Sequence, residues 1–234
     1  MPTSTLMRTG LAAAFVASLV TAQILAVKIL AIPLPYSLPV VGEVILVPAG
    51  VLAFGITFLA TDCYTELYGD RAAHRLVNLG LGTIVLMLGL LWVAIVLPGS
   101  EAGVDPGMFA AVLEPSTNIV MGGLLAYIVS QHWDVFTFHR VRQFTDGRYL
   151  WIRNLGSTGT SQAIDTTIFI LTAFWFAPLV LGIGEALPAV VLASLILGQY
   201  LAKLAIAVFD TPFVYLLVGW ARRDDGDIAG PAIS

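Results

Sequence analysis

The sequence predicts an all-α integral membrane protein with six transmembrane helices and both termini in the cytoplasm. Of its 234 residues, 58% are hydrophobic and only 11% are charged, whereas soluble domains carry about 25% charged residues. Six segments reach the roughly 20 mainly apolar residues that a helix needs to cross a bilayer. Lys and Arg are concentrated in every second loop between these segments and are absent from the others. This is the pattern of a membrane protein whose cytoplasmic loops carry the basic residues.

The predicted spans follow one another with short polar connections. They cover residues 9–32, 43–68, 76–97, 109–130, 158–181 and 188–220. The first is a full-length apolar run, so we interpret it as a retained span and not as a cleaved signal peptide. The fourth is interrupted by Pro115, and the sixth is long enough to be bent or tilted. The loop after the third span, with Glu101, Asp105 and Glu114, is predicted to be an external loop or a short re-entrant piece. Residues 1–220 form one predicted membrane domain, and residues 221–234 a polar cytoplasmic tail.

The basic residues define the orientation. Nine of the eleven Lys and Arg residues fall on one side of the predicted spans: Arg8, Arg71, Arg75, Arg140, Arg142, Arg148, Arg153, Arg222 and Arg223. The loops after the first, third and fifth spans contain none. Cytoplasmic loops carry an excess of Lys and Arg, so both termini are predicted to be cytoplasmic, in a multi-pass protein of the plasma (inner) membrane.

Asp62 and Glu66 stand near the end of the second span, four residues apart. On a helix this spacing places both carboxylates on one face. Two acids at the end of a membrane helix are costly unless they are paired, hydrated or bound to a ligand. They are therefore candidate site residues.

A second polar group lies around the fourth and fifth spans. Gln131 and Asp134 close the fourth span, and they are either solvated residues of a helix end or part of a site. Asn154, Ser157 and Asp165 lead into the fifth span. The small and hydroxylated residues there also suit close helix packing. Asp165 lies deeper in apolar sequence, which favours a functional carboxylate.

The sixth span carries Gln199, Lys203 and Asp210 close to one helical stripe. Lys203 is either one half of a structural ion pair, with Asp210, Asp165 or Asp62, or a cation that holds a substrate oxygen. Lys28, near the end of the first span, is interpreted as a structural residue that reaches the interface. Aromatic candidates for stacking on a ligand are Tyr36, Tyr64, Tyr68, Phe58, Phe169 and Trp133, none of which the sequence singles out.

Several function classes lack their signatures. The chain has no glycine-rich phosphate loop, no His pair spaced for zinc and no nucleophile elbow. Its one cysteine, Cys63, excludes an internal disulfide. We therefore expect no enzyme activity, no cofactor, no metal and no nucleic-acid partner. Interior carboxylates, amides, hydroxyls and one lysine suit a small, planar, mostly uncharged polar molecule, because a carboxylate can accept from a ring N–H and an exocyclic amine together.

The sequence also resembles a known family, and the resemblance covers roughly residues 10–220. It rests on the following residues: Phe58 to Asp62 with Glu66 to Gly69; Gln131 with Asp134 to Phe136 and Arg140 to Arg142; Ser157 and Thr158 with Asp165 and Thr166; and Lys203. These resemble the queuosine precursor transporters, also called VUT or YhhQ-like proteins. The resemblance implies six spans and import of 7-deazaguanine precursors of modified transfer-RNA bases, such as 7-cyano-7-deazaguanine and 7-aminomethyl-7-deazaguanine, with queuine taken by some members. The Asp62 and Glu66 pair fits one branch of the family.

On this hypothesis Asp62, Glu66 or Asp165 accepts from the guanidine-like edge of the base, and Gln131, Asn154, Ser157 or Lys203 donates to its carbonyl. The predicted substrate-binding residues are Asp62, Glu66, Gln131, Asp134, Asn154, Ser157, Asp165, Gln199 and Lys203. One alternative is a substrate-capture subunit of an ATP-driven, ECF-like vitamin transporter. The small-residue face at Ala14, Ser18 and Ala22 is suited to docking a coupling helix, and equally to packing in a homo-oligomer. An intramembrane enzyme is the second alternative, based on the paired acids alone.

Overall fold

The computed structural model describes the backbone of residues 3–38, 41–144 and 150–228, and side chains within residues 5–37, 41–130, 132–133 and 159–222. Eight α-helices, one π-helical segment (η1) and two strands make up the described chain. In order they are α1 (Thr3–Leu25), β1 (Ile29–Leu38), β2 (Gly42–Pro48), α2 (Val51–Tyr68), α3 (Asp70–Val96), α4 (Pro106–Leu113), α5 (Ser116–Phe144), α6 (Leu150–Leu171), η1 (Thr172–Phe176), α7 (Ala177–Leu181) and α8 (Ala189–Ile228).

Five stretches of helix are long and apolar enough to cross a membrane. They are Thr5–Leu25, Asp70–Val96, Pro106–Ser130, Gly159–Leu181 and Ala189–Arg222. The mostly helical membrane class predicted from the sequence is therefore confirmed. Helix α2 does not join this group, because Asp62 and Glu66 in its last two turns lower the mean hydropathy of its 18 residues.

The first and second predicted spans are wrong at their facing ends, because Ile29–Leu38 and Gly42–Pro48 form antiparallel strands and not helix. Strand β1 pairs with β2 from Ile29 opposite Pro48 to Pro33 opposite Val44, with an irregularity beyond Pro33. Proline removes a backbone donor and blocks a helix interior, and β-branched side chains favour a pleated surface. Pro33 and Pro35 are therefore incompatible with a continued helix. Lys28 lies exposed in the turn before β1, outside any helix.

The hairpin packs directly on helix α8. The hydroxyl of Ser194 accepts a hydrogen bond from the backbone N–H of Leu46 at 3.2 Å. At Gly198, one turn further along α8, an added Cβ would lie 2.1 Å from the carbonyl oxygen of Leu46. Only glycine permits this approach, since real Cβ contacts are never so short. A hydroxyl and a glycine on one face of α8 therefore fix the strand against the helix.

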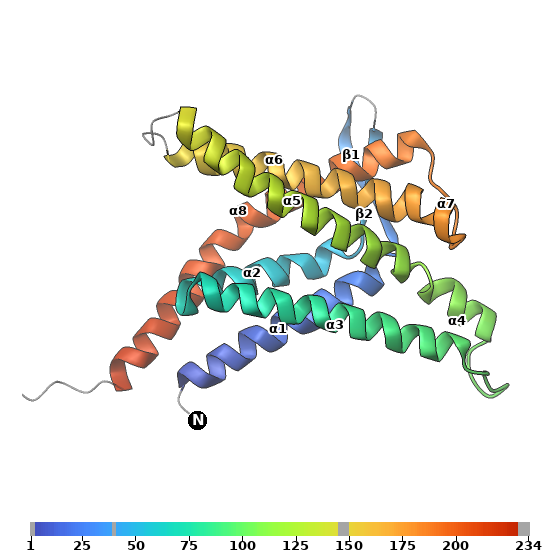
Figure 1. The fold of residues 1–234 in the computed structure, drawn as a ribbon, viewed down its shortest axis with the longest axis horizontal. Coiled ribbons are helices and arrows are strands. Elements are labelled where there is room, and N and C mark those ends of the chain that lie inside the picture. The colour runs from blue at the N-terminus through green and yellow to red at the C-terminus, as the bar shows by residue number, and fades with distance from the viewer. Residues whose placement is uncertain (1–2, 39–40, 145–149, 229–234) are drawn as a thin grey trace, which may run out of the picture.

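The long helices arrange their ends in two groups (Figure 1). The N-terminal end of α1, the junction of α2 and α3, the adjoining ends of α5 and α6, and the C-terminal part of α8 lie at one end of the molecule. The α3–α4 connection and α7 lie at the other end. Gly69, with φ of 80°, makes the sharp junction between α2 and α3. The segments that carry the arginines in the sequence therefore meet at the same end.

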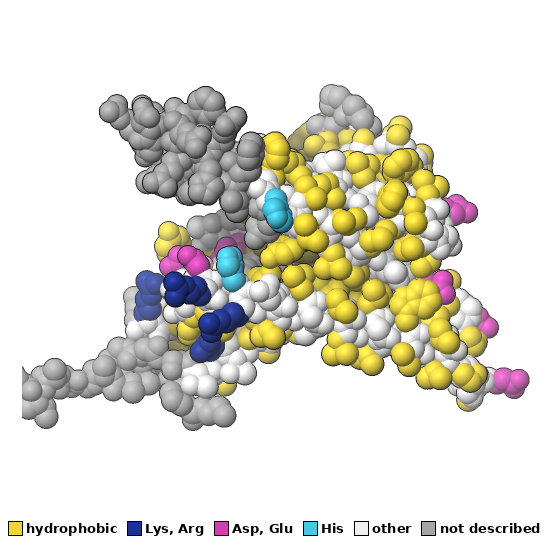
Figure 2. All heavy atoms as spheres, in the orientation of Figure 1, with side chains coloured by type: hydrophobic (Ala, Val, Ile, Leu, Met, Phe, Trp, Pro, Cys, Tyr) yellow, Lys and Arg dark blue, Asp and Glu magenta, His cyan; other side chains and the backbone are white. Residues whose placement is uncertain are grey.

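The described surface is largely apolar between these ends (Figure 2). On this face, Lys and Arg side chains gather at one end, and acidic side chains alone mark the opposite rim. Helix α3 illustrates the apolar zone, with Leu79, Leu86, Leu90 and Val93 all more than half exposed. Exposed apolar surface of this extent is typical of a protein whose solvent is lipid.

Helix also extends into two regions that were predicted to connect or follow the spans. The loop after the third predicted span contains α4, whose first turn is capped by Asp105 Oδ1 accepting from the N–H of Met108 at 2.8 Å. The sixth predicted span continues past residue 220, because α8 extends to Ile228 and contains Pro212. The predicted polar tail therefore begins as a continuation of this helix.

Candidate functional site

A cavity of about 270 Å³ lies where six helices converge. Helices α1, α2, α3, α5, α6 and α8 all contribute side chains, so every long helix among the described residues borders the cavity. Its size is slightly below the roughly 300–1,000 Å³ of sites for drug-sized ligands. Most of its wall is apolar, and its charged and amide side chains are Gln23, Asp165, Gln199 and Lys203. The cavity therefore suits a small ligand with a few polar groups.

The strongest polar feature of the cavity is an ion pair. Lys203 Nζ on α8 lies 2.6 Å from Asp165 Oδ2 on α6. The other oxygen, Asp165 Oδ1, accepts from the hydroxyl of Ser130 on α5 at 3.2 Å. The Lys203 side chain is only 7% exposed and that of Asp165 is 24% exposed. Three helices thus meet at one carboxylate, which still has lone pairs facing the cavity.

Two glutamines also line the cavity. Gln199 lies one helical turn before Lys203, and Gln23 enters from α1. Both are almost completely buried, and neither side-chain oxygen has a hydrogen-bond partner among the described residues. Buried polar atoms nearly always have a partner. Two unpaired amide oxygens in one cavity are therefore available to donors of a bound molecule.

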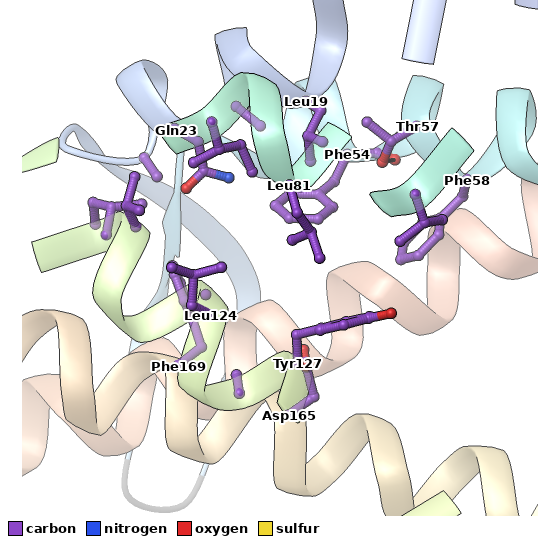
Figure 3. A pocket seen from close by; sticks show the side chains of 18 of the residues that line it. Leu19, Gln23, Phe54, Thr57, Phe58, Leu81, Leu124, Tyr127, Asp165 and Phe169 are labelled. Atoms are coloured by element: carbon purple, nitrogen blue, oxygen red, sulfur yellow. Dashed lines mark hydrogen bonds between the residues drawn. The ribbon is translucent and has the colours of Figure 1, made fainter. Parts of the chain in front are cut away.

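Aromatic rings provide flat surfaces in the same cavity. Phe54 and Phe58 of α2 lie 6.1 Å apart between ring centroids, and Tyr127 of α5 and Phe169 of α6 complete the set. Figure 3 shows the ring of Tyr127 next to Asp165, with Phe54 and Phe58 across the open space and Gln23 farther from Asp165. A planar ligand held at Asp165 would therefore meet a ring.

The structure brings together only part of the predicted site. Asp165, Gln199 and Lys203 share the cavity, as do the aromatic candidates Phe58 and Phe169. The side chains of Gln131, Asp134, Asn154 and Ser157 lie outside the described residues. Tyr36, Tyr64, Tyr68 and Trp133 do not line this cavity. Sequence reasoning missed Gln23, Phe54 and Tyr127. Gln23 gave a signal, because it is the single amide within the apolar stretch of α1.

Asp62 and Glu66 face a different hollow from Asp165. They line a second pocket of about 370 Å³ between α2 and α8, together with Thr65, Thr211, Val214, Tyr215, Val218 and Arg222. Glu66 Oε2 lies 3.6 Å from Arg222 Nη2, and both side chains are about 60% exposed. A pair this exposed is worth about 0–1 kcal/mol. The acidic pair therefore lies toward the end of the molecule at which the basic side chains gather.

Asp210 is not the partner of Lys203. It is 8% exposed, and its Oδ2 has no hydrogen-bond partner among the described residues. It lies with Ile206, Phe209 and Phe213 in a shallow apolar groove between α2 and α8. Of the three partners that the sequence allowed for Lys203, the structure selects Asp165.

These features define a multi-helix membrane protein with a central, mostly apolar cavity that has an ion pair in its wall. Residues 48–217 match the family described as "Putative vitamin uptake transporter", and the chain belongs to this family. It is 32% identical over 167 residues to the "Probable queuosine precursor transporter" of Bacillus subtilis, which covers 71% of this chain and 69% of the relative. It is 29% identical over 134 residues to the "Queuosine precursor transporter" of Escherichia coli, covering 55% of this chain and 56% of the relative. No solved structure matches the chain.

Proposed function

We propose that this chain imports 7-deazaguanine precursors of queuosine across the plasma (inner) membrane, with 7-cyano-7-deazaguanine, 7-aminomethyl-7-deazaguanine and queuine as candidate substrates. The observation that carries the proposal is the Asp165–Lys203 ion pair in the wall of a cavity shared by six helices. The names of the two relatives support the substrate class. The cavity is apolar apart from a few side chains, as a site for a flat heterocycle should be.

The ion pair matches the edge of a guanine-type ring. That edge presents a carbonyl oxygen, a ring N–H and an exocyclic amine in a row. Lys203 has N–H groups left to donate to the carbonyl, and Asp165 has lone pairs left to accept from the two nitrogen donors. Gln199, one turn away, offers a further acceptor. Hydrogen bonds to charged groups are worth about 1.5–3 kcal/mol each, so this edge would dominate recognition.

Asp62 and Glu66 have a different part in the proposed cycle. Helices α2 and α8 line both the central cavity and the second pocket. We place the second pocket on the route by which the ligand leaves toward the cytoplasm. Gln131, Asp134, Asn154 and Ser157 remain predicted ligand contacts, since they lie on the same helices as Ser130 and Asp165.

The proposed topology has six spans with cytoplasmic termini. Helix α2 would be added to the five long apolar helices, as the second span in sequence order. Its 18 residues extend about 27 Å, close to the roughly 30 Å of a hydrocarbon core. Its acids would then lie at the interface. The end of the molecule where the arginine-bearing segments meet (Figure 1) would face the cytoplasm.

Uptake by the purified full chain in liposomes tests the function. We expect saturable accumulation of labelled 7-cyano-7-deazaguanine, competed by other 7-deazaguanines and not by adenine, with the ligand recovered chemically unchanged. Binding without uptake would favour the substrate-capture subunit. The small-residue face of α1 is weak support for that alternative, because Ala22 is fully buried against the start of α2. A Cβ added at Gly50 would lie 2.5 Å from the carbonyl oxygen of Ala22. Absence of any binding would contradict the proposed function.

A further inference from the structure

Gln23 is the one polar side chain that α1 contributes to the central cavity. It is 6% exposed, and its Oε1 has no hydrogen-bond partner among the described residues. In Figure 3 its amide points into the cavity, on the side away from Asp165. Gly123 of α5 lies next to the amide, because a Cβ there would be in van der Waals contact with Gln23 Oε1 at 3.9 Å. The amide therefore lies in the cavity wall beside α5, and its oxygen is not engaged by a hydrogen bond from another described residue.

The two polar regions of the cavity differ in what they can recognise. Asp165 and Lys203 present fixed, charged groups, which suit the fixed pattern of a ring edge. Gln23 carries both an acceptor oxygen and a donor NH₂ group on one uncharged amide, and rotation by half a turn exchanges them. A group of this kind accepts partners of either polarity, as a ligand end that varies in chemistry would require.

We propose that Gln23 determines specificity for the substituent on the five-membered ring of the ligand. This inference rests on the proposed function. With the ring edge held at Asp165 and Lys203, the five-membered ring extends away from the ion pair, toward the other polar region of the cavity. An aminomethyl group, cationic at neutral pH like other primary amines, donates to Oε1. A nitrile accepts from the NH₂ group. The neutral amide thus admits both precursors.

The test measures binding of three ligands to the purified full chain: 7-aminomethyl-, 7-cyano- and unsubstituted 7-deazaguanine. Gln23→Glu replaces the neutral amide by a carboxylate, which pairs with the ammonium and repels the nitrile. We expect the ratio of aminomethyl to cyano affinity to rise about tenfold or more, as replacing a neutral by a charge-assisted hydrogen bond implies. Gln23→Leu should bring the three affinities closer together, because it can bond to neither substituent.

Matched controls come from Gln162 on α6. Its Oε1 is also buried and has no hydrogen-bond partner in the part of the chain that the structure describes, yet its side chain does not line the cavity. Gln162→Glu and Gln162→Leu should leave all three ratios unchanged. If Gln23→Glu does not fold, Gln23→Met serves as the test variant. Its side chain cannot replace the hydrogen bonds of the amide, so both substituted ligands must lose affinity relative to the unsubstituted one.

Two results separate this inference from the function on which it rests. If the parent binds none of the three ligands, the proposed function fails and the inference fails with it. If the parent binds them but the Gln23 variants weaken all three by the same factor, or by none, Gln23 does not read the substituent. An equal loss would indicate contact with the ring itself, and would overturn the proposal while leaving the transport function standing.

Discussion

Lys203 and Asp165 are 38 residues apart in sequence, and their charged atoms lie 2.6 Å apart in the wall of the central cavity. Of the two ion pairs among the described residues, this is the one with a buried cation. It joins α6 to α8, and Ser130 adds α5. The same atoms that hold these helices together are those that would hold a ligand.

Lys203→Met should therefore be far more harmful than Lys28→Met. Removing one partner leaves the Asp165 carboxylate without its cation, and breaking a buried pair typically costs about 3–5 kcal/mol. Lys28 is exposed in the turn before β1. Thermal unfolding in detergent, with and without ligand, measures the difference. Equal stability and equal uptake in the two variants would remove Lys203 from the site.

Asp165→Asn should separate binding from folding, with Asp62→Asn as its counterpart. The amide keeps the size of the carboxyl group but turns one acceptor into a donor that faces the N–H groups of the base. We expect a loss of about ten- to hundredfold in affinity at Asp165, measured on monodisperse protein. Asp62 lines the other pocket, so its variant should bind normally and transport slowly. The reverse pattern would move base recognition to the second pocket.

Gly198→Ala should destabilise the protein through the hairpin. The new Cβ would lie 2.1 Å from the carbonyl oxygen of Leu46, so strand and helix must separate. Overpacking of this kind typically costs about 1–3 kcal/mol. Gly219→Ala is the control on the same helix, because nothing lies within 4 Å of its added Cβ; it should be neutral or stabilising. A lower unfolding temperature for Gly219→Ala than for Gly198→Ala would contradict the contact.

Thiol labelling tests the topology. The single native cysteine, Cys63, is fully buried, so background labelling should be low. With an impermeant reagent outside intact cells, Glu101→Cys should react and Arg71→Cys should not. Both parent residues are exposed, so access to the aqueous side decides the outcome. Labelling of Arg71→Cys alone would invert the proposed orientation.

The sequence predicted most of the helical framework, because apolar length and proline or glycine breaks are local properties. It did not predict the hairpin. Residues 29–48 are as apolar as a span, and hydropathy does not distinguish a strand from a helix. Prolines at 33 and 35 were the available signal. The contacts that secure the hairpin, Ser194 and Gly198 on Leu46, join segments about 150 residues apart and leave no local trace.

The site was predicted in part for a related reason. A charged residue within apolar sequence is easy to recognise, so Asp165 and Lys203 were identified as candidates. Asp165 was one of three possible partners of Lys203, and the sequence could not choose among them because the choice depends on how α6 and α8 cross. Asp62 was grouped with them by chemistry, and the structure assigns it to another pocket by geometry. Gln23 was overlooked because an uncharged amide in an apolar helix suggests helix packing as readily as ligand binding.

The ion pair also has an electrical consequence. Because the charges of Asp165 and Lys203 cancel, the empty cavity carries no net charge from this pair. Carrying one elementary charge across a membrane is worth about 2.3 kcal/mol per 100 mV. Entry of an uncharged ring such as the cyano precursor should thus be indifferent to voltage, whereas an aminomethyl ligand brings its own positive charge and would be drawn inward by a negative interior. Two molecules that differ only in one small substituent would then accumulate to different extents through the same protein.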